Sequence, residues 1–122
     1  MVKLVFALRR LPHLSREEFQ RYWREVHAPL VRKHAETLGI RRYVQTHTLE
    51  TPLNQATAAS RSAPEEYDGV AELWWDSLES YAQSASSTEG RQAAIELLED
   101  ERRFIDHARS PLWLNEENPV VS

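Results

Sequence analysis

The chain has 122 residues, a formal net charge of −4, 41% hydrophobic and 28% charged residues, and no cysteine. This composition predicts one globular domain and excludes disulfides, a thiolate nucleophile and cysteine-ligated zinc. Because there is no general basic surface and no apolar run long enough to cross a bilayer, we expect neither nucleic acid nor membrane as a partner. Arginines interrupt the first ten residues too early for a secretory signal, so we expect a cytoplasmic protein.

The first part of the chain predicts a strand and then an interrupted helix. Residues 2–10 are apolar on both faces of a strand, which indicates a sheet covered on both sides. Ser15 and Glu18 have the spacing of a capping box, which opens a helix. Its buried stripe is expected at intervals of three to four residues: Phe19, Trp23, Val26 and Leu30. Pro29 predicts a kink or a restart, and Gly39 is placed to end the helix.

The remaining elements alternate between strands and helices around one long irregular segment. Residues 50–66 are rich in Ala, Ser, Thr and Pro without an apolar period, which predicts a long mobile loop. The other expected elements are strands over 40–49, 68–76 and 112–114, a short helix over 77–86 with Leu78 and Tyr81 inward, and a long helix over 89–108 buried along Ala94, Leu97, Leu98, Phe104 and Ile105. Residues 1–116 then form the domain, and residues 117–122 form a loose tail or a dimer clasp.

This order of elements predicts an α+β fold. Four strands with helices packed on one side form a ferredoxin-like sandwich with a four-stranded antiparallel sheet. The other face of the sheet is also apolar, through Val5, Ala7 and one side of the run Leu73-Trp74-Trp75. Because an exposed apolar face of this kind is an association surface, we expect a homodimer in which two sheets meet.

Several segments carry a family resemblance: KLVFALRR at 3–10, LSREEF at 14–19, Tyr22-Trp23 followed by His27-Ala28-Pro29, and then YDGVAELWWDSLESY and EDERRFIDHARSP. Together they resemble the EthD-domain family of the dimeric α/β-barrel superfamily, over about residues 2–114. The resemblance implies a barrel built from two four-stranded sheets. It also implies a small-molecule cavity in each subunit, between the sheet and the helices.

The resemblance implies a kind of function without choosing the reaction. EthD is named for an association with ethyl tert-butyl ether degradation alongside a haem monooxygenase, and similar proteins of polyketide pathways act as dehydratases, cyclases or cofactor-free oxygenases. We therefore expect a cofactor-free protein that binds an apolar small organic molecule. Its step would be oxidoreductase-associated or a dehydratase- or cyclase-like proton transfer, in catabolism or secondary metabolism. The alternative is a non-catalytic binding protein that serves a monooxygenase system.

Three residues are candidates for acid–base chemistry. His27 follows Trp23 by four residues on one flank of the helix and is either catalytic or a structural histidine, and histidine is the side chain best suited to move protons near neutral pH. Tyr22 lies about 140° from His27 on a regular helix and is either catalytic or a core aromatic. Glu72 interrupts the apolar third strand, so it is an acid or base of raised pKa or pairs with an arginine such as Arg9, Arg41 or Arg42.

Aromatic side chains are candidates for the walls of a ligand cavity that His27 faces: Phe6, Trp23, Tyr43 and Trp74. Trp74 and Trp75 point to opposite faces of their strand, so one can line the cavity while the other fills the dimer interface. His27 and His34 are two helical turns apart, about 10 Å, so no metal site is expected. No cofactor motif is visible, although haem-binding members of the superfamily leave His27 open as an axial ligand.

The other ionisable side chains are expected to face solvent and are given no function. They are His13, His34 and His107, together with a helical ion-pair network of Glu99, Arg102, Arg103 and Asp106. His47 alternates with Tyr43 and Gln45 along its strand, so it either joins them in a polar face or is exposed, and the exposed position is favoured.

Overall fold

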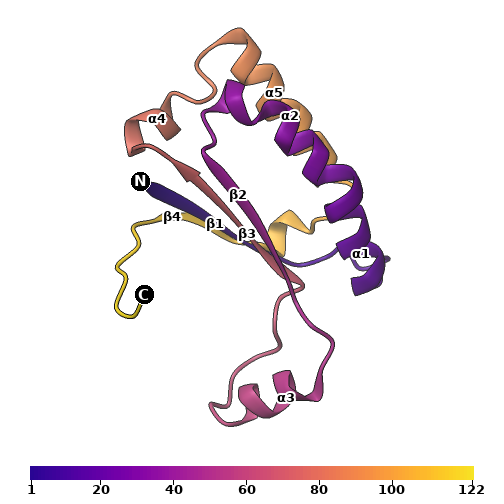
Figure 1. The fold of residues 1–122 in the computed structure, drawn as a ribbon. Helices are drawn as coiled ribbons and strands as arrows, with labels where there is room; N and C mark the ends of the chain where they lie inside the picture. Colours follow the sequence, from indigo (N-terminus) through magenta and orange to yellow (C-terminus); the bar gives the residue numbers. More distant parts are fainter.

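The computed structural model describes residues 1–122 as one sheet with helices on one of its faces (Figure 1). The elements are β1 Val2–Leu8, α1 Arg16–Tyr22, a π-helical turn Trp23–His27, α2 Ala28–Leu38, β2 Arg42–His47, α3 Pro52–Ala59, β3 Gly69–Trp75, α4 Leu78–Ala82, α5 Thr88–Glu101, a 3₁₀ turn His107–Arg109 and β4 Leu112–Asn115. The four strands are antiparallel in the order β2-β3-β1-β4. The predicted α+β sandwich with a four-stranded antiparallel sheet is confirmed.

The core lies between the sheet and the layer of α1, α2 and α5. Alternate residues of β1 and β3 face the helices, among them Phe6, Leu8 and Ala71, because successive side chains of a strand point to opposite faces. One buried cluster centres on the helix residue Trp23, and a second joins Trp75 of β3 to α2 and α5. No helix is long and apolar enough to span a bilayer.

The helical segment after Ser15 buries a different stripe from the expected one. Its buried residues are Phe19, Trp23, His27 and Val31, whereas Val26 is 47% exposed and Leu30 is only partly buried. Four-residue steps overshoot a regular helical turn by about 40° each, so they drift around an α-helix. The π turn between α1 and α2 takes up the extra residue and brings all four side chains back to the core.

The expected restart at Pro29 is present: the π-helical turn ends at His27, and α2 begins at Ala28 with Pro29 in its first turn. The Ala28 N–H donates to the Trp23 carbonyl, five residues back, so the wide turn lies directly before the proline. Because proline has no N–H and its ring crowds the preceding turn, the wider turn before it accommodates Pro29 at the start of α2. Gly39 ends α2 as predicted, with a left-handed φ of 72° that only glycine adopts easily.

Residues 50–66 are not all loop, because they contain α3. Thr51 caps the Leu53 N–H and Pro52 occupies the first turn, which are ordinary helix-start signals. The helix has no buried residue, and Leu53 is 72% exposed. An apolar period was absent because α3 has no core to face, and Figure 1 shows it extending beyond the end of the sheet.

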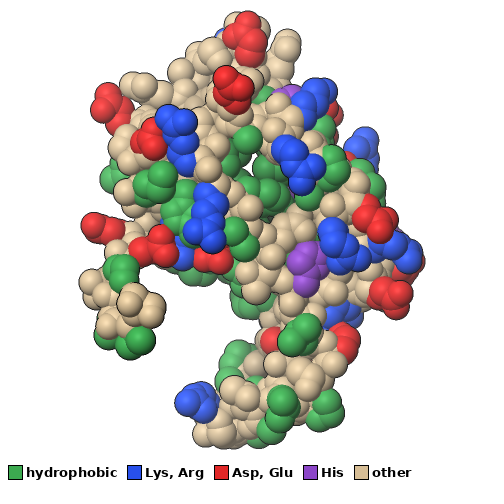
Figure 2. Space-filling view, in the orientation of Figure 1, with side chains coloured by type: hydrophobic (Ala, Val, Ile, Leu, Met, Phe, Trp, Pro, Cys, Tyr) green, Lys and Arg blue, Asp and Glu red, His purple; other side chains and the backbone are tan.

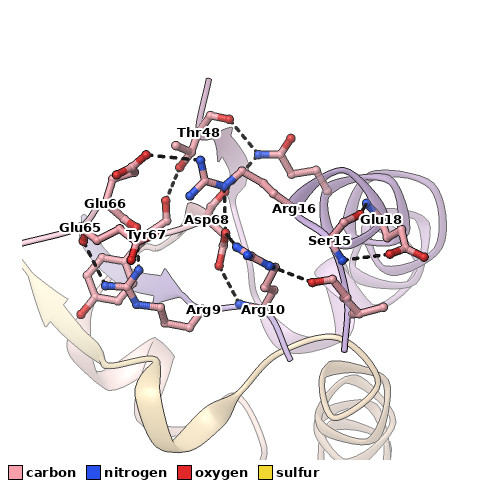
Figure 3. A network of polar contacts seen from close by, with 12 residues as sticks. Arg9, Arg10, Ser15, Arg16, Glu18, Thr48, Glu65, Glu66, Tyr67 and Asp68 are labelled. Atoms are coloured by element: carbon pink, nitrogen blue, oxygen red, sulfur yellow. Dashed lines mark hydrogen bonds and ion pairs between the residues drawn. The ribbon is translucent and has the colours of Figure 1, made fainter. Parts of the chain in front are cut away.

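The base of this α3 arm is held by the buried carboxylate of Asp68 (Figure 3). Asp68 accepts hydrogen bonds from the Arg10 backbone N–H at 2.8 Å, from the Arg10 guanidinium, and from Arg16 Nε at 2.9 Å. Burial would raise the pKa of Asp68, but these donors outweigh it and hold the pKa below its usual value. The end of β1, the start of α1 and the start of β3 are therefore joined at one charged group.

Two other helix expectations are wrong in detail. α5 ends at Glu101 instead of 108, although Phe104 and Ile105 are still buried beyond its end. Leu78 and Leu98 are 60% and 39% exposed, so neither faces the core. The helix face that packs inward is instead the one carrying Ala93, Leu97 and Asp100.

Candidate functional site

A small cavity of about 50 Å³ lies between the sheet and the helices. Eleven residues line it, and nine of them are hydrophobic. Three of the expected wall residues are among them: Phe6, Trp23 and Tyr43. The two charged or titrating exceptions are His27 and Glu101. The structure therefore brings His27 together with three of the four aromatic residues expected around it.

The imidazole of His27 is buried and has one defined partner. Its Nδ1 lies 2.8 Å from Oδ2 of Asp100, and both side chains are at most 6% exposed. An ionised carboxylate only accepts hydrogen bonds, so Nδ1 carries the proton. Nε2 has no hydrogen-bond partner in the chain, and in the neutral ring it holds a free lone pair. This arrangement is that of a histidine oriented to act as a base.

Asp100 was missed by the sequence reasoning and organises this part of the site. Besides His27, it accepts a hydrogen bond from the Tyr22 hydroxyl at 2.6 Å and one from Arg103 at 3.0 Å, both on Oδ1. Burial would raise the pKa of Asp100, but the hydrogen bonds from Tyr22, His27 and Arg103 lower it below its usual value. Arg103, expected in a solvent-facing ion-pair network, therefore pairs with a buried carboxylate.

Tyr22 does not line the cavity, and its relation to His27 differs from the expected 140°. The π turn places residues five apart on one side of the helix, so Tyr22 and His27 share Asp100. The hydroxyl of Tyr22 is committed to that carboxylate, and burial together with Asp100 raises its pKa. Tyr22 therefore positions Asp100 and has no access to a molecule in the cavity.

Tyr43 is the one residue of the cavity lining that carries a hydroxyl group. Its oxygen accepts hydrogen bonds from the Trp23 indole N–H at 3.2 Å and from Gln45 Nε2 at 2.9 Å. Burial raises the pKa of Tyr43, so the hydroxyl stays neutral. Glu101, on the same cavity, accepts a hydrogen bond from His107 Nε2 at 3.0 Å.

His47 joins Tyr43 and Gln45 in a polar row along β2, which is the alternative to the exposed position that was favoured. Its ring packs on Trp23 with centroids 4.5 Å apart, and its Nε2 lies 2.8 Å from Gln45 Oε1. Its Nδ1 is buried without a partner. Burial, and then the charge of Arg24, lowers the pKa of His47, so the ring is neutral near pH 7.

An open groove of about 200 Å³ between α2 and β2 adjoins the cavity. Val31 and Tyr43 line both spaces, so their side chains form the wall between them. The groove has an apolar floor with arginines around it, and Figure 2 shows a hydrophobic hollow flanked by basic side chains over α2 and β2.

Glu72 and Trp74 lie on the opposite face of the sheet from His27, so Trp74 does not line the cavity as expected. Glu72 pairs with Lys3 at 2.7 Å, and none of the three arginines considered reaches it. Trp74 donates its indole N–H to Glu117 at 2.8 Å in the C-terminal tail. Strand alternation required Trp74 and Trp75 to diverge but did not say which one faces the helices.

No group of three or more His, Asp or Glu side chains is arranged to hold a metal ion. His34 pairs with Glu96 at 2.8 Å and His107 with Glu101, so neither is simply solvated. A haem group is far larger than the 50 Å³ cavity, so the residues around His27 do not fit it as an axial ligand.

The family model of the EthD domain matches residues 11–108. The chain belongs to the EthD domain family. The matched region contains the polar residues of the site: His27, Tyr43, Asp100 and Glu101. The resemblance that began at Tyr22-Trp23 and His27-Ala28-Pro29 is thereby confirmed, and no functionally curated protein matches the chain.

Solved structures share the fold. An ethyl tert-butyl ether degradation family protein from Bacillus halodurans is 24% identical, with a TM-score of 0.64 over 97% of this chain and 99% of that one. A dimeric protein of unknown function and ferredoxin-like fold from Bacteroides fragilis is 12% identical, with a TM-score of 0.59 over 95% of each chain. SnoaB, a cofactor-independent oxygenase from Streptomyces nogalater, is 16% identical, with a TM-score of 0.53 over 98% and 95%. The ferredoxin-like fold is confirmed.

Proposed function

We propose that this EthD-domain protein binds an apolar small organic molecule beneath α2 and that His27 transfers a proton on it without a cofactor. One observation carries the proposal: Asp100 holds Nδ1 of His27, while Nε2 is unpartnered at an apolar cavity. A buried, oriented imidazole is the usual general base of enzymes working near neutral pH. Phe6, Trp23 and Tyr43 provide the surrounding walls.

The ligand would enter through the groove between α2 and β2. The cavity alone is the size of one or two water molecules, whereas ligand sites usually measure about 300–1,000 Å³. Rotation of the Val31 side chain in the shared wall would join the cavity to the 200 Å³ groove. The joined space suits a small cyclic or branched molecule.

The reaction class we propose is proton transfer of the dehydratase or cyclase type, or cofactor-free oxygenation, in a catabolic or biosynthetic pathway of the cytoplasm. The likeness to a cofactor-independent oxygenase supports the second form. The alternative is a non-catalytic binding protein for a monooxygenase, and the predominance of hydrophobic residues around the cavity favours it. Whether His27 is needed for turnover separates the two.

We also propose that residues 1–116 form a homodimer through the free face of the sheet, closing an α/β barrel. This face carries Val5, Val44 and Val70, with the 48% exposed Trp113 at its edge. The dimeric state of the Bacteroides fragilis protein supports the assembly. Residues 117–122 would pack at its edge, where Glu117 already contacts Trp74. Sedimentation at the mass of one chain at micromolar concentration would contradict the dimer.

The catalytic proposal is tested with a screen of small apolar ring compounds by NMR, followed by product analysis on those that bind. His27→Ala should retain binding but lose roughly 10²–10⁴-fold in turnover, the usual contribution of a positioned acid or base. His34→Ala is the matched control, because its imidazole pairs with Glu96 of α5 and does not line the cavity. Binding without turnover in the wild-type protein would assign it to the accessory class, and turnover that His27→Ala leaves unchanged would refute the catalytic role of His27. Binders that leave the signals of cavity residues unchanged would refute the site.

A further inference from the structure

We propose that Tyr43 is the hydrogen-bond donor of this cavity and that the ligand therefore carries a carbonyl oxygen beside an acidic C–H bond. The proposal rests on the proposed function, since it requires a molecule in the cavity next to His27. It names the chemical class of that molecule, which the apolar walls alone do not.

The hydrogen bonds around Tyr43 leave its own proton free. The indole N–H of Trp23 is only a donor, so the Tyr43 oxygen accepts that bond. Gln45 Nε2 also lies 3.0 Å from the Trp23 carbonyl oxygen, which requires the nitrogen of the amide to face this side. The same nitrogen therefore donates to Tyr43. Because two N–H groups donate to its oxygen, the Tyr43 hydroxyl still has its own O–H available as a donor.

His47 locks the amide in this orientation. Gln45 Oε1 faces His47 Nε2 at 2.8 Å, so that nitrogen is protonated, and the unpartnered Nδ1 is the lone-pair side of the ring. A protonated ring would bury a second N–H without an acceptor, and burial lowers the pKa of His47 accordingly. A flipped Gln45 amide would point its NH₂ group at the N–H of His47 and bring its Oε1 against the Trp23 carbonyl oxygen. The hydrogen bonds among Trp23, Tyr43, Gln45 and His47 therefore have one stable arrangement.

No side chain of the protein accepts the Tyr43 proton. Glu101, on the same cavity, is engaged by His107, and no hydrogen bond joins it to Tyr43. A buried hydroxyl without an acceptor costs free energy, which a ligand oxygen in the cavity would recover. Oxygens that accept without needing to donate are those of ethers and of carbonyl groups such as ketones and esters. Of these, only the carbonyl compounds also carry an acidic C–H bond for His27 as a base.

Together, Tyr43 and His27 suit the enolisation of such a ligand. His27 Nε2 takes the proton from the carbon next to the carbonyl group, and the C–H electron pair becomes the C=C bond of the enolate. The π pair of the C=O bond moves to oxygen, where the Tyr43 hydrogen bond stabilises the charge. Return of the proton from His27 to carbon completes an exchange in which nothing is oxidised or reduced.

The test compares cyclohexanone with methylenecyclohexane, which has the same shape but no acceptor. Tyr43→Phe should weaken cyclohexanone binding by roughly three- to tenfold, the worth of one neutral hydrogen bond, and leave methylenecyclohexane binding unchanged. It should also slow the exchange of cyclohexanone α-protons for deuterium in D₂O by about 10²-fold, as loss of an oxyanion donor does. Tyr81→Phe is the matched control, because that ring packs on Trp75 outside the cavity.

Equal loss of both probes in Tyr43→Phe, or unchanged cyclohexanone binding, would overturn the assignment while leaving the proposed function standing. If neither probe shifts the His27 signals of the wild-type protein, the proposed function fails and this inference with it. Should Tyr43→Phe not fold, 3-fluorotyrosine at position 43 keeps the shape and makes the hydroxyl a stronger donor. Tighter cyclohexanone binding is then expected, and unchanged binding overturns the proposal.

Discussion

Replacing Asp100 by Asn tests the charged group on which the orientation of His27 depends. Three hydrogen bonds end on this carboxylate, from Tyr22, His27 and Arg103. A hydrogen bond to a charged group contributes about 1.5–3 kcal/mol and a neutral one about 0.5–1.5 kcal/mol. Discounting the exposed Arg103, we expect Asp100→Asn to lower the free energy of unfolding at pH 7 by about 2–4 kcal/mol.

The deficit should depend on pH in a defined direction. The folded state holds the pKa of Asp100 below its ordinary value of 3.8, so the carboxylate stabilises the fold fully above that pH. This contribution is lost as the pH falls through the lower, folded-state pKa. Urea unfolding of wild type and variant should therefore differ most near pH 7 and converge below about pH 4. Asp76→Asn, at an exposed pair with Arg41, is the control and should change stability by less than about 0.5 kcal/mol.

The same variant should move the ring proton of His27 from Nδ1 to Nε2. Tyr22 and Arg103 both donate to Oδ1 of Asp100, so the Asn oxygen stays with them and its NH₂ group faces His27. Nδ1 must then accept, and the ring proton moves to Nε2, at the cavity. ¹⁵N NMR of the imidazole distinguishes the two tautomers. A stability loss below about 0.5 kcal/mol, or a ring still protonated on Nδ1, would refute the orienting role of Asp100.

Two further variants probe how the site is supported. Gly69→Ala places a Cβ about 2.5 Å from the Trp23 ring. We therefore expect the free energy of unfolding, measured with urea, to fall by about 1–3 kcal/mol and the NMR signals of cavity residues to shift. Unchanged NMR shifts at Trp23 would contradict this packing. Asp68→Asn removes the charged partner of Arg10 and Arg16, so we expect the free energy of unfolding to fall by about 2–4 kcal/mol near neutral pH. Because the folded state lowers the pKa of Asp68, this loss should shrink below about pH 4. Equal losses at pH 7 and pH 3 would show that the charge is unimportant.

The fold could be predicted because the apolar residues of its strands and helices repeat with clearly different periods. The role of Asp100 could not be predicted in this way. Asp100 lies in a charged run next to Glu99 and Glu101, which is typical of a solvated helix face. One signal in the sequence does mark Asp100 as buried. It lies three residues after Leu97 and four before Phe104, which is the spacing of the buried stripe of α5 and of the turn after it. A carboxylate on a buried stripe needs partners, and that requirement would have pointed to His27.

The errors at Trp74 and Glu72 have a different origin. Strand alternation puts both on one face but does not say which face the helices cover. The presence of Glu72 on that face was itself a sign that the other one, with Ala71 and Trp75, was covered. The helical stripe was misplaced because it assumed 3.6 residues per turn across a segment that contains a wider turn.

The wide turn before Pro29 also has an evolutionary meaning. Buried positions at four-residue intervals from Phe19 to Val31 are those of a regular amphipathic helix after the insertion of one residue between Trp23 and His27. Removing one of the three exposed residues between them would restore ordinary helical spacing and leave the buried side chains the same. Homologues one residue shorter here can therefore share the fold, and an alignment without a gap at this turn would pair His27 with the wrong residue.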